Sequence, residues 1–99
     1  MTDWPTLAIN IVTYDRIDTL RTTLARLHTH LWYEGEQRYF VADDGSDDGT
    51  QAMLLEEWPD VTLIQSQRAG LGANTNAGLR ASLGVADYVL QLQDDMQLL

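Results

Sequence analysis

The chain has 99 residues, 44% of them hydrophobic, and no cysteine. This length suits one compact domain, and the lack of cysteine excludes a disulfide framework and a thiolate metal site. Fifteen Asp and Glu residues against six Lys and Arg give a formal charge of −9, which argues against nucleic acid as a partner because a phosphate backbone would be repelled.

The N-terminal third predicts a strand followed by a helix. Leu7 to Val12 is short, apolar and rich in β-branched residues, as in a buried strand, and a polar turn follows it. From Ile17 to Leu31, isoleucine and leucine recur at spacings of three and four, which places them on one face of a helix. Because a carboxylate near the first turn can accept the unpaired N–H groups there, Asp15 or Asp18 is expected to cap this helix.

The middle of the chain predicts a second strand and a short helix joined by an acidic stretch. Arg38 to Ala42 is the strand, and Gln51 to Trp58 is the helix, which Pro59 ends. Between them lies Asp-Asp-Gly-Ser-Asp-Asp-Gly-Thr, residues 43–50. A helix–loop–helix calcium site is excluded there, because Leu55 stands where its bidentate Glu is required.

The C-terminal third adds two strands and a helix. Val61 to Ile64 and Tyr88 to Leu92 are the strands, and a helix rich in small residues runs from about Ala73 to Ser82. Strands that alternate with helices indicate right-handed βαβ units. The expected fold is therefore α/β, a three-layer sandwich around a mostly parallel sheet, in a single domain over residues 1–99.

The glycine-bearing loop before the last helix does not match a common nucleotide motif. Gly70 and Gly72 resemble the start of a dinucleotide fingerprint, but Thr75 stands where the third glycine belongs. The Gly-Lys-Thr/Ser sequence of a P-loop does not occur in the chain. Rossmann-type cofactor binding and P-loop nucleotide hydrolysis are therefore set aside.

Acidic pairs follow two of the predicted strands at their carboxyl ends, where an open parallel sheet binds its ligands. Asp43 and Asp44 follow the second strand, and Asp94 and Asp95 follow the fourth. The adjacent carboxylates of Asp94 and Asp95 would repel each other, and a divalent cation would relieve that repulsion. Two plainer interpretations stay open: Ser46 to Asp48 only cap the next helix, and the last pair is solvated surface.

Four segments carry a family resemblance. They are residues 9–16 (Ile-Asn-Ile-Val-Thr-Tyr-Asp-Arg), 41–50 (Val-Ala-Asp-Asp-Gly-Ser-Asp-Asp-Gly-Thr), 70–79 (Gly-Leu-Gly-Ala-Asn-Thr-Asn-Ala-Gly-Leu) and 88–95 (Tyr-Val-Leu-Gln-Leu-Gln-Asp-Asp). In order and spacing they resemble glycosyltransferase family 2. The resemblance covers about Leu7 to Leu98 and implies the N-terminal, nucleotide-sugar-binding part of such an enzyme, with a Rossmann-like GT-A fold.

The resemblance implies roles for the residues at the ends of the first two strands. Thr13 and Tyr14 would lie against the nucleoside, together with Asp15, which replaces the commoner Asn of the family's first turn. Asp44 would accept a hydrogen bond from the base. Asp43 would support the turn from which Asp44 reaches the substrate.

A cation at the last acidic motif is a further implication of the resemblance. Asp95 would bind Mg²⁺ or Mn²⁺ bridging the diphosphate of the donor, a UDP-sugar by preference, and Asp94 would face the ribose or sugar. The cation would act as a Lewis acid that stabilises the departing nucleoside diphosphate. Gln93 occupies the first acidic position of the usual DxD motif, so this DxD-like site would rest on Asp95 with help from Asp94.

The expected function is donor binding by a glycosyltransferase. In the family the catalytic base and the acceptor site follow the acidic motif, so the chain is expected to be truncated after it, or completed by another chain, with an unknown acceptor. The alternative is a non-catalytic module of the same fold. Uncovered strand edges near Leu98 and Leu99 predict self-association. The lack of a signal peptide and of an apolar run of roughly 20 residues predicts a cytoplasmic location.

Overall fold

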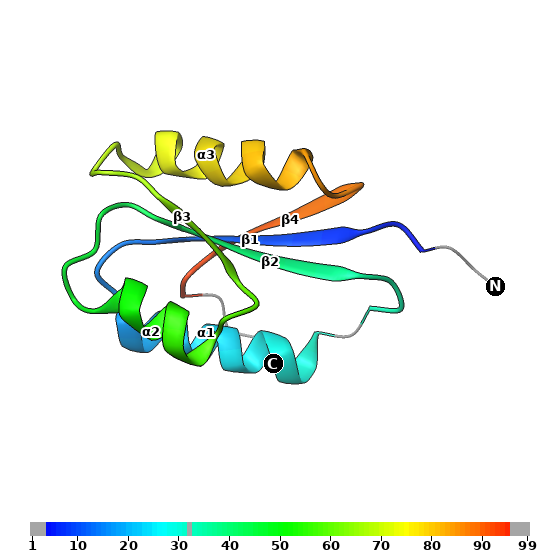
Figure 1. The fold of residues 1–99 in the computed structure, drawn as a ribbon, viewed down its shortest axis with the longest axis horizontal. Coiled ribbons are helices and arrows are strands. Elements are labelled where there is room, and N and C mark those ends of the chain that lie inside the picture. The colour runs from blue at the N-terminus through cyan, green and yellow to red at the C-terminus, as the bar shows by residue number, and fades with distance from the viewer. Residues whose placement is uncertain (1–3, 32, 96–99) are drawn as a thin grey trace.

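Strands and helices alternate along the chain in the computed structural model, which describes residues 4–31 and 33–95 (Figure 1). Every predicted element is present, and the predicted ends lie within two residues of the observed ones. In chain order the elements are β1 (Leu7–Thr13), α1 (Ile17–His30), β2 (Gln37–Asp43), α2 (Thr50–Glu57), β3 (Thr62–Gln65), α3 (Leu71–Leu83) and β4 (Tyr88–Gln93).

The four described strands form one sheet in the order β3-β2-β1-β4, and every pair in it is parallel. Leu7 at the start of β1 pairs with Gln37 on one side and with Tyr88 on the other. After β3 the chain crosses the sheet and returns beside β1, so the order of the strands reverses there. Ligands of open α/β sheets bind beyond the carboxyl ends of the strands at such a reversal.

The helices cover both faces of the sheet, which confirms the expected three-layer α/β sandwich. Helices α1 and α2 lie against one face, and α3 lies against the other (Figure 1). The face under α1 and α2 holds the apolar core, in which long side chains from both layers are buried. Its members are Ile9, Ile11, Leu20, Leu24, Leu27, Tyr39, Val41, Met53, Leu54 and Leu92.

The face under α3 buries apolar side chains such as Val12 and Phe40, and it differs from the other face because it also buries polar side chains. Asn10 of β1 is fully buried, and its amide donates to Oε1 of Gln91 on β4 at 2.6 Å. A side chain at Gly78 would overlap the side chain of Asn10, so glycine lets the helix approach the sheet closely. Ser82, one turn further along α3, is also fully buried and donates to the carbonyl of Gly78 at 2.7 Å.

The cap of α1 differs from the expectation. Neither Asp15 nor Asp18 accepts its first amide; instead the amide of Ile17 donates to Oδ2 of Asp48, 2.9 Å away on the β2–α2 loop. The other carboxylate oxygen of Asp48 accepts the amide of Thr50 at 3.1 Å. One carboxylate therefore caps two helices, and the capping interpretation of the acidic stretch is confirmed for this residue.

The described edge strand β4 leaves apolar side chains in water. Tyr88 is 63% exposed and Leu90 is 37% exposed. Leu98 and Leu99 lie outside the described residues, so self-association stays a prediction. Over the described part of the chain, we find no helix with the length and apolar character needed to cross a membrane.

Candidate functional site

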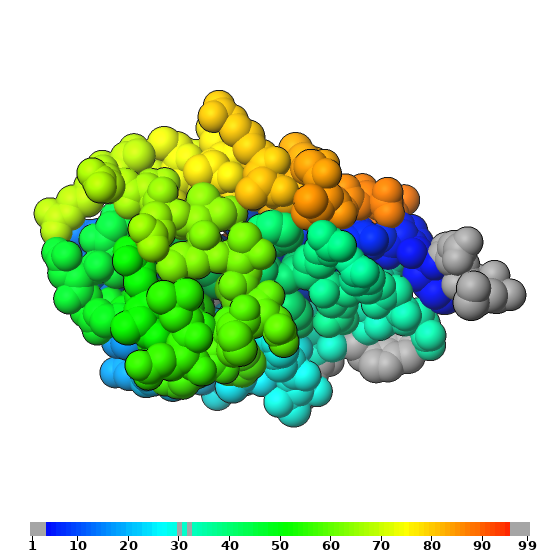
Figure 2. Space-filling model, viewed as in Figure 1, coloured from blue at the N-terminus to red at the C-terminus, as the bar shows by residue number. Residues whose placement is uncertain are grey.

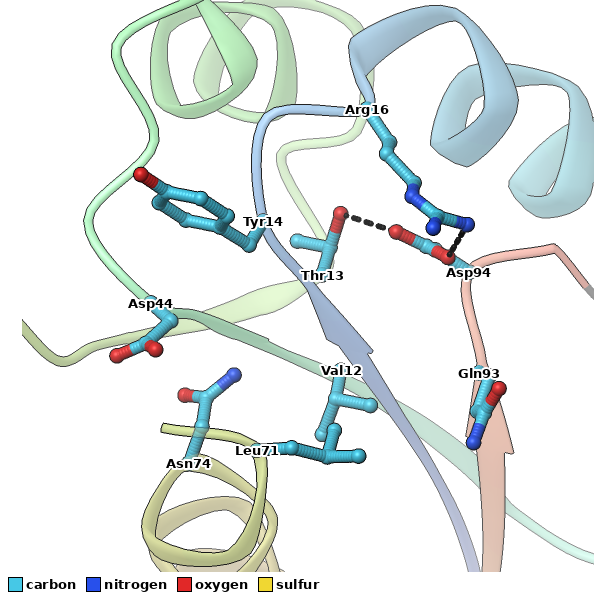
Figure 3. Close-up of a pocket in the computed structure, with 9 residues that line it drawn as sticks. All are labelled: Val12, Thr13, Tyr14, Arg16, Asp44, Leu71, Asn74, Gln93 and Asp94. Carbon is cyan, nitrogen blue, oxygen red and sulfur yellow. Dashed lines mark hydrogen bonds and ion pairs between the residues drawn. The ribbon is translucent and has the colours of Figure 1, made fainter. Parts of the chain in front are cut away.

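The loops that follow β1, β2 and β3 and the end of β4 lie at the end of the sheet away from the start of β1 (Figure 1). Figure 2 shows the segments after β2 and β3 side by side there. A cavity of about 370 Å³ lies among them. Residues from β1, the β1–α1 turn, the end of β2, the start of α3 and the end of β4 line it (Figure 3). The lining residues are Val12, Thr13, Tyr14, Arg16, Asp44, Leu71, Asn74, Gln93 and Asp94.

The turn after β1 supplies one wall of the cavity. Thr13 is buried, and its hydroxyl donates to Oδ2 of Asp94 at 3.0 Å. Tyr14 is 39% exposed, and the guanidinium of Arg68 lies 5.7 Å from the centre of its ring. An exposed aromatic ring with a cation above it offers a planar surface on which a ligand ring can stack.

Asp44 lines the cavity and also holds the next loop in place. Its Oδ1 accepts the amide of Ala69 at 2.7 Å, and its Oδ2 accepts the amide of Gly70 at 3.0 Å. Each carboxylate oxygen has two lone pairs, so both oxygens keep acceptor capacity for a ligand. Asp44 therefore connects the end of β2 to the start of α3, where the cavity lies.

Asp43 is fully buried and lies behind the lining. Its carboxylate accepts the amide of Ser46 at 3.1 Å and the side-chain amide of Gln51 at 2.8 Å, and the hydroxyl of Ser46 donates to it as well. These bonds hold the tight turn after β2, in which Gly45 has a φ of +85°. The carboxylate is thus placed to support the turn, which is the role that the resemblance implies, and it does not line the cavity as a substrate-binding residue would.

Asp15 also lies outside the cavity lining and joins two loops. Its amide donates to the hydroxyl of Ser46 at 2.8 Å, and its Oδ1 accepts the amide of Asp47 at 2.7 Å. Its φ of +49° is in the left-handed region, which Asp tolerates better than most side chains. These contacts fix the β1–α1 turn against the β2–α2 loop.

Asp94 is the buried member of the last acidic pair. Arg16 Nη1 lies 3.4 Å from its Oδ1, and the backbone carbonyl of Asp94 accepts the hydroxyl of Thr23 at 2.6 Å. Burial raises the pKa of the Asp94 carboxyl above its usual range, although the Thr13 hydroxyl and the Arg16 guanidinium act in the opposite direction. This carboxylate is held in place and faces the cavity.

Asp95 is far more exposed than its neighbour. Its side chain is 59% exposed, and Arg16 Nη1 lies 3.8 Å from its Oδ2. Within residues 4–31 and 33–95, no three Asp, Glu, His or Cys side chains gather closely enough to hold a metal by themselves. Mg²⁺ is usually bound by one or two carboxylates together with substrate phosphates. Asp95 is outside the cavity lining, so Asp94 alone of the pair faces the cavity, and the guanidinium of Arg16 lies beside both carboxylates. The two carboxylates fit that donor set.

The cavity also uses residues that were not predicted as site residues. Arg16 and Asn74 both lie in segments that carry the family resemblance, but residue type alone did not single them out. Asn74 is 2% exposed, and its Nδ2 donates to the carbonyl of Ala42 at 2.8 Å. Its Oδ1 has no partner in the described part of the chain. The amide of Asn74 thus adds an unpaired acceptor near Asp44.

A second hollow, of about 700 Å³, lies between the β2–α2 loop and the segment from the end of β3 to Arg68. Asp47 and Arg68, two of its lining residues, pair at 3.0 Å and are largely exposed. None of Asp43, Asp44 and Asp94 lines it. The smaller cavity is therefore the better candidate site, because the lining carboxylates of two strands meet there.

Comparison with known proteins gives one family and one fold. A family model described as Glycosyl transferase family 2 matches residues 8–99. Among solved structures, the chain is similar to the mannosyltransferase PcManGT from Pyrobaculum calidifontis, in complex with GDP-Man and Mn²⁺, with a TM-score of 0.80 and 23% identity. The match covers 95% of this chain and 28% of that one. No curated protein matches the sequence.

Proposed function

This chain belongs to glycosyl transferase family 2, and we propose on that premise that its cavity binds a nucleotide-diphosphate sugar as glycosyl donor. One observation carries the proposal: Thr13, Asp44 and Asp94, which follow or end three different strands, line one cavity. The mannosyltransferase with the same fold was solved with GDP-Man, which supports a donor of this class.

The nucleoside lies against the turn after β1 in this proposal. Tyr14 offers an exposed ring for the base, and Asp44 accepts a hydrogen bond from a base N–H. Stacking of one base on an aromatic side chain contributes about 1–3 kcal/mol. Asp94 faces the ribose or the sugar from the end of β4, where the Thr13 hydroxyl donates to its carboxylate.

A divalent cation completes the site, with Asp95 as its main ligand and Asp94 in support. The Mn²⁺ in the similar mannosyltransferase supports this assignment, and Mg²⁺ has the same preference for oxygen ligands. When bound, the cation supplies Lewis-acid stabilisation of the leaving nucleoside diphosphate. Asp95 is exposed enough to turn toward a donor diphosphate, whereas Asp94 is held by Thr13.

Titration calorimetry over a panel of donors tests the proposal. The panel contains UDP-glucose, UDP-N-acetylglucosamine, GDP-mannose and the free sugars, each with Mg²⁺, with Mn²⁺ and with a chelator. We expect a dissociation constant of about 1 mM or lower for at least one donor, with UDP-sugars first and a cation required. Absence of heat for every donor with either cation would overturn the proposal.

Replacement of Tyr14 by Ala examines the nucleoside contact. Loss of the stacking surface is expected to weaken donor binding roughly 5- to 150-fold, as its stabilisation of about 1–3 kcal/mol implies. Tyr88→Ala is the matched control, because Tyr88 is also an exposed tyrosine but lies on β4 away from the cavity lining. Equal losses in both variants would speak against a base at Tyr14.

Binding without transfer is a second candidate function, and Gln93 favours it. Its neutral side chain lines the cavity where the family usually has a carboxylate, which leaves less charge for a cation. Mass spectrometry of acceptors incubated with the bound donor separates the two functions. A glycosylated acceptor excludes the binding-only function, whereas hydrolysis of the donor alone leaves it standing.

A further inference from the structure

Arg16 places a positive charge beside the acidic pair Asp94 and Asp95 at the cavity. It is the only cationic side chain among the described residues that line the cavity. Its Nη1 lies 3.4 Å from Oδ1 of Asp94 and 3.8 Å from Oδ2 of Asp95 (Figure 3 shows the first contact). The guanidinium therefore stands at the acidic pair to which the proposed function assigns the divalent cation.

We propose that Arg16 is an exchangeable counter-ion of this acidic pair. Its guanidinium neutralises Asp94 and Asp95 while no divalent cation is bound, and it leaves them when one binds. The freed guanidinium then turns to the donor diphosphate. This inference rests on the proposed function, since it assumes that a cation and a nucleotide-diphosphate sugar bind in this cavity.

The acidic pair needs a resident positive charge. Asp94 is buried, and a buried carboxylate without a partner is costly to the fold. Its neighbour Asp95 adds a second negative charge to the same turn. Arg16 offsets both charges, while the hydroxyl of Thr13 keeps the Asp94 carboxylate in position through the oxygen that Arg16 does not contact.

The contacts of Arg16 are suited to exchange. Its side chain is 56% exposed, and a single nitrogen reaches both carboxylates at long distances. Arg21, on the neighbouring helix α1, shows the opposite arrangement: its Nε and Nη2 bind the two carboxylate oxygens of Glu57 at 3.1 and 3.2 Å. The pair with exposed Asp95 is weak because water screens both charges, and the contact with Asp94 uses one guanidinium nitrogen at 3.4 Å, so a divalent cation can displace Arg16.

A freed guanidinium has a ready use in this cavity. The described lining carries two carboxylates, Asp44 and Asp94, which repel a diphosphate. A guanidinium binds phosphate oxygens through two parallel hydrogen bonds and stays charged at any working pH. Arg16 thus opposes binding of the cation alone and favours binding of the cation together with the nucleotide.

Paramagnetic resonance of Mn²⁺ gives a readout that does not depend on activity, because bound Mn²⁺ loses the sharp signal of the free ion. For Mn²⁺ alone, Arg16→Gln is expected to bind about three to ten times more tightly than the unmodified chain. For GDP or UDP at saturating Mn²⁺, the same variant is expected to bind roughly tenfold more weakly. The opposite signs of the two effects distinguish exchange from a structural role.

Arg21→Gln is the matched control, since it removes the same charge in α1, close to Arg16 in the sequence but outside the cavity lining. It should change both affinities less than about twofold. Arg16→Lys keeps the charge and is expected to fall between the unmodified chain and Arg16→Gln. Circular dichroism and urea midpoints of each variant confirm that the chains compared are folded.

Two results would overturn the proposal that a divalent cation displaces Arg16. One is an Mn²⁺ affinity that stays equal or falls in Arg16→Gln, which would make Arg16 a fixed support of the acidic pair. The other is nucleotide binding that needs no cation in the unmodified chain. Failure of the proposed function is separate: it appears as the absence of nucleotide-sugar binding to the unmodified chain under every condition.

Discussion

The two faces of the sheet are built on different principles. The face under α1 and α2 buries long apolar side chains such as Ile9, Leu24 and Val41. The face under α3 buries amides among apolar side chains such as Phe40, and the Oδ1 atoms of Asn10 and Asn74 have no partner in the described part of the chain. The first arrangement favours stability, and the second leaves polar capacity beside a cavity.

The two faces therefore contribute differently: one stabilises the fold, and the other leaves polar groups for a ligand. Full burial of one large aliphatic side chain contributes about 1.5–3 kcal/mol, so the α1 face can stabilise the whole sheet. Unpaired buried polar groups cost about 1–3 kcal/mol each, and they persist where a ligand or a water can meet them. Substitutions in the two faces test this difference.

Truncation in the α1 face should have the largest effect. Leu24 is fully buried, so Leu24→Ala is expected to lower the free energy of unfolding by about 2–5 kcal/mol. Leu71→Ala serves as its counterpart on the α3 side, because Leu71 is 62% exposed and should cost less than about 0.5 kcal/mol. Urea unfolding followed by tryptophan fluorescence measures both. Similar losses in the two variants would abolish the contrast.

Addition of a methyl group between α3 and the sheet should have the second-largest effect on the free energy of unfolding. Gly78→Ala places a Cβ on the side chain of Asn10, and overpacking of this kind costs about 1–3 kcal/mol, reduced by the better helix propensity of Ala. The same substitution in an Asn10→Ala background should cost much less. A double-mutant cycle from urea midpoints checks this, and an unchanged cost in that background would show that the close approach is not the cause.

Loss of the shared cap should have a smaller effect. Asp48→Ala removes the acceptor of the Ile17 and Thr50 amides and is expected to cost about 1 kcal/mol at pH 7. Asp47→Ala is the control, because Asp47 only pairs with exposed Arg68 and should change the free energy of unfolding by less than about 0.5 kcal/mol.

The cost of Asp48→Ala should also depend on pH. Partial burial opposes the charge, but hydrogen bonds from the Thr50 hydroxyl and from the amides of Ile17 and Thr50 outweigh it and hold the pKa of Asp48 below 3.8. The carboxylate therefore stabilises the fold above pH 3.8, and this contribution fades as the pH falls through the lower pKa of the folded chain. If Asp48→Ala lowered the free energy of unfolding by the same amount from pH 7 down to pH 2, this explanation would be wrong.

Neutralisation of Asp94 should have the smallest effect on stability and a large one on function. Burial raises the pKa of its carboxyl above 3.8, so the fold loses stability as the pH rises from 3.8 to the raised pKa, and the whole penalty is present above it. Asp94→Asn is expected to unfold at an equal or higher urea concentration at pH 7, with no such gain below pH 3.8. Its Mn²⁺ affinity should fall. A loss above about 1 kcal/mol would make Asp94 a structural residue.

Much of the fold followed from local patterns. Ile17, Leu20, Leu24 and Leu27 recur at helical spacing, and the apolar run from Leu7 to Val12 has the length of a strand, so each element could be placed within two residues. The acidic pairs were predictable for a topological reason: parallel strands end at one edge, and Asp44 and Asp94 directly follow two of them.

Other contacts depend on loops that meet only in the folded chain. The cap of α1 by Asp48 joins residues 31 positions apart, whereas the local rule pointed to Asp15 or Asp18. The pairing of Arg16 with Asp94 spans 78 positions, and no spacing in the sequence indicates it. Local periodicity carries no information about which loop lies opposite which.

From the sequence alone we could predict the order of the strands and helices, the apolar layer beneath α1, and the carboxylates at the strand ends. These follow from side-chain periodicity and from backbone preferences that act over a few residues. Tertiary structure decided which of those carboxylates face the cavity, since Asp44 and Asp94 line it while Asp43 and Asp15 hold turns behind it. Their chemistry is the same, but burial, hydrogen-bond donors and the nearest cation depend on packing between distant segments.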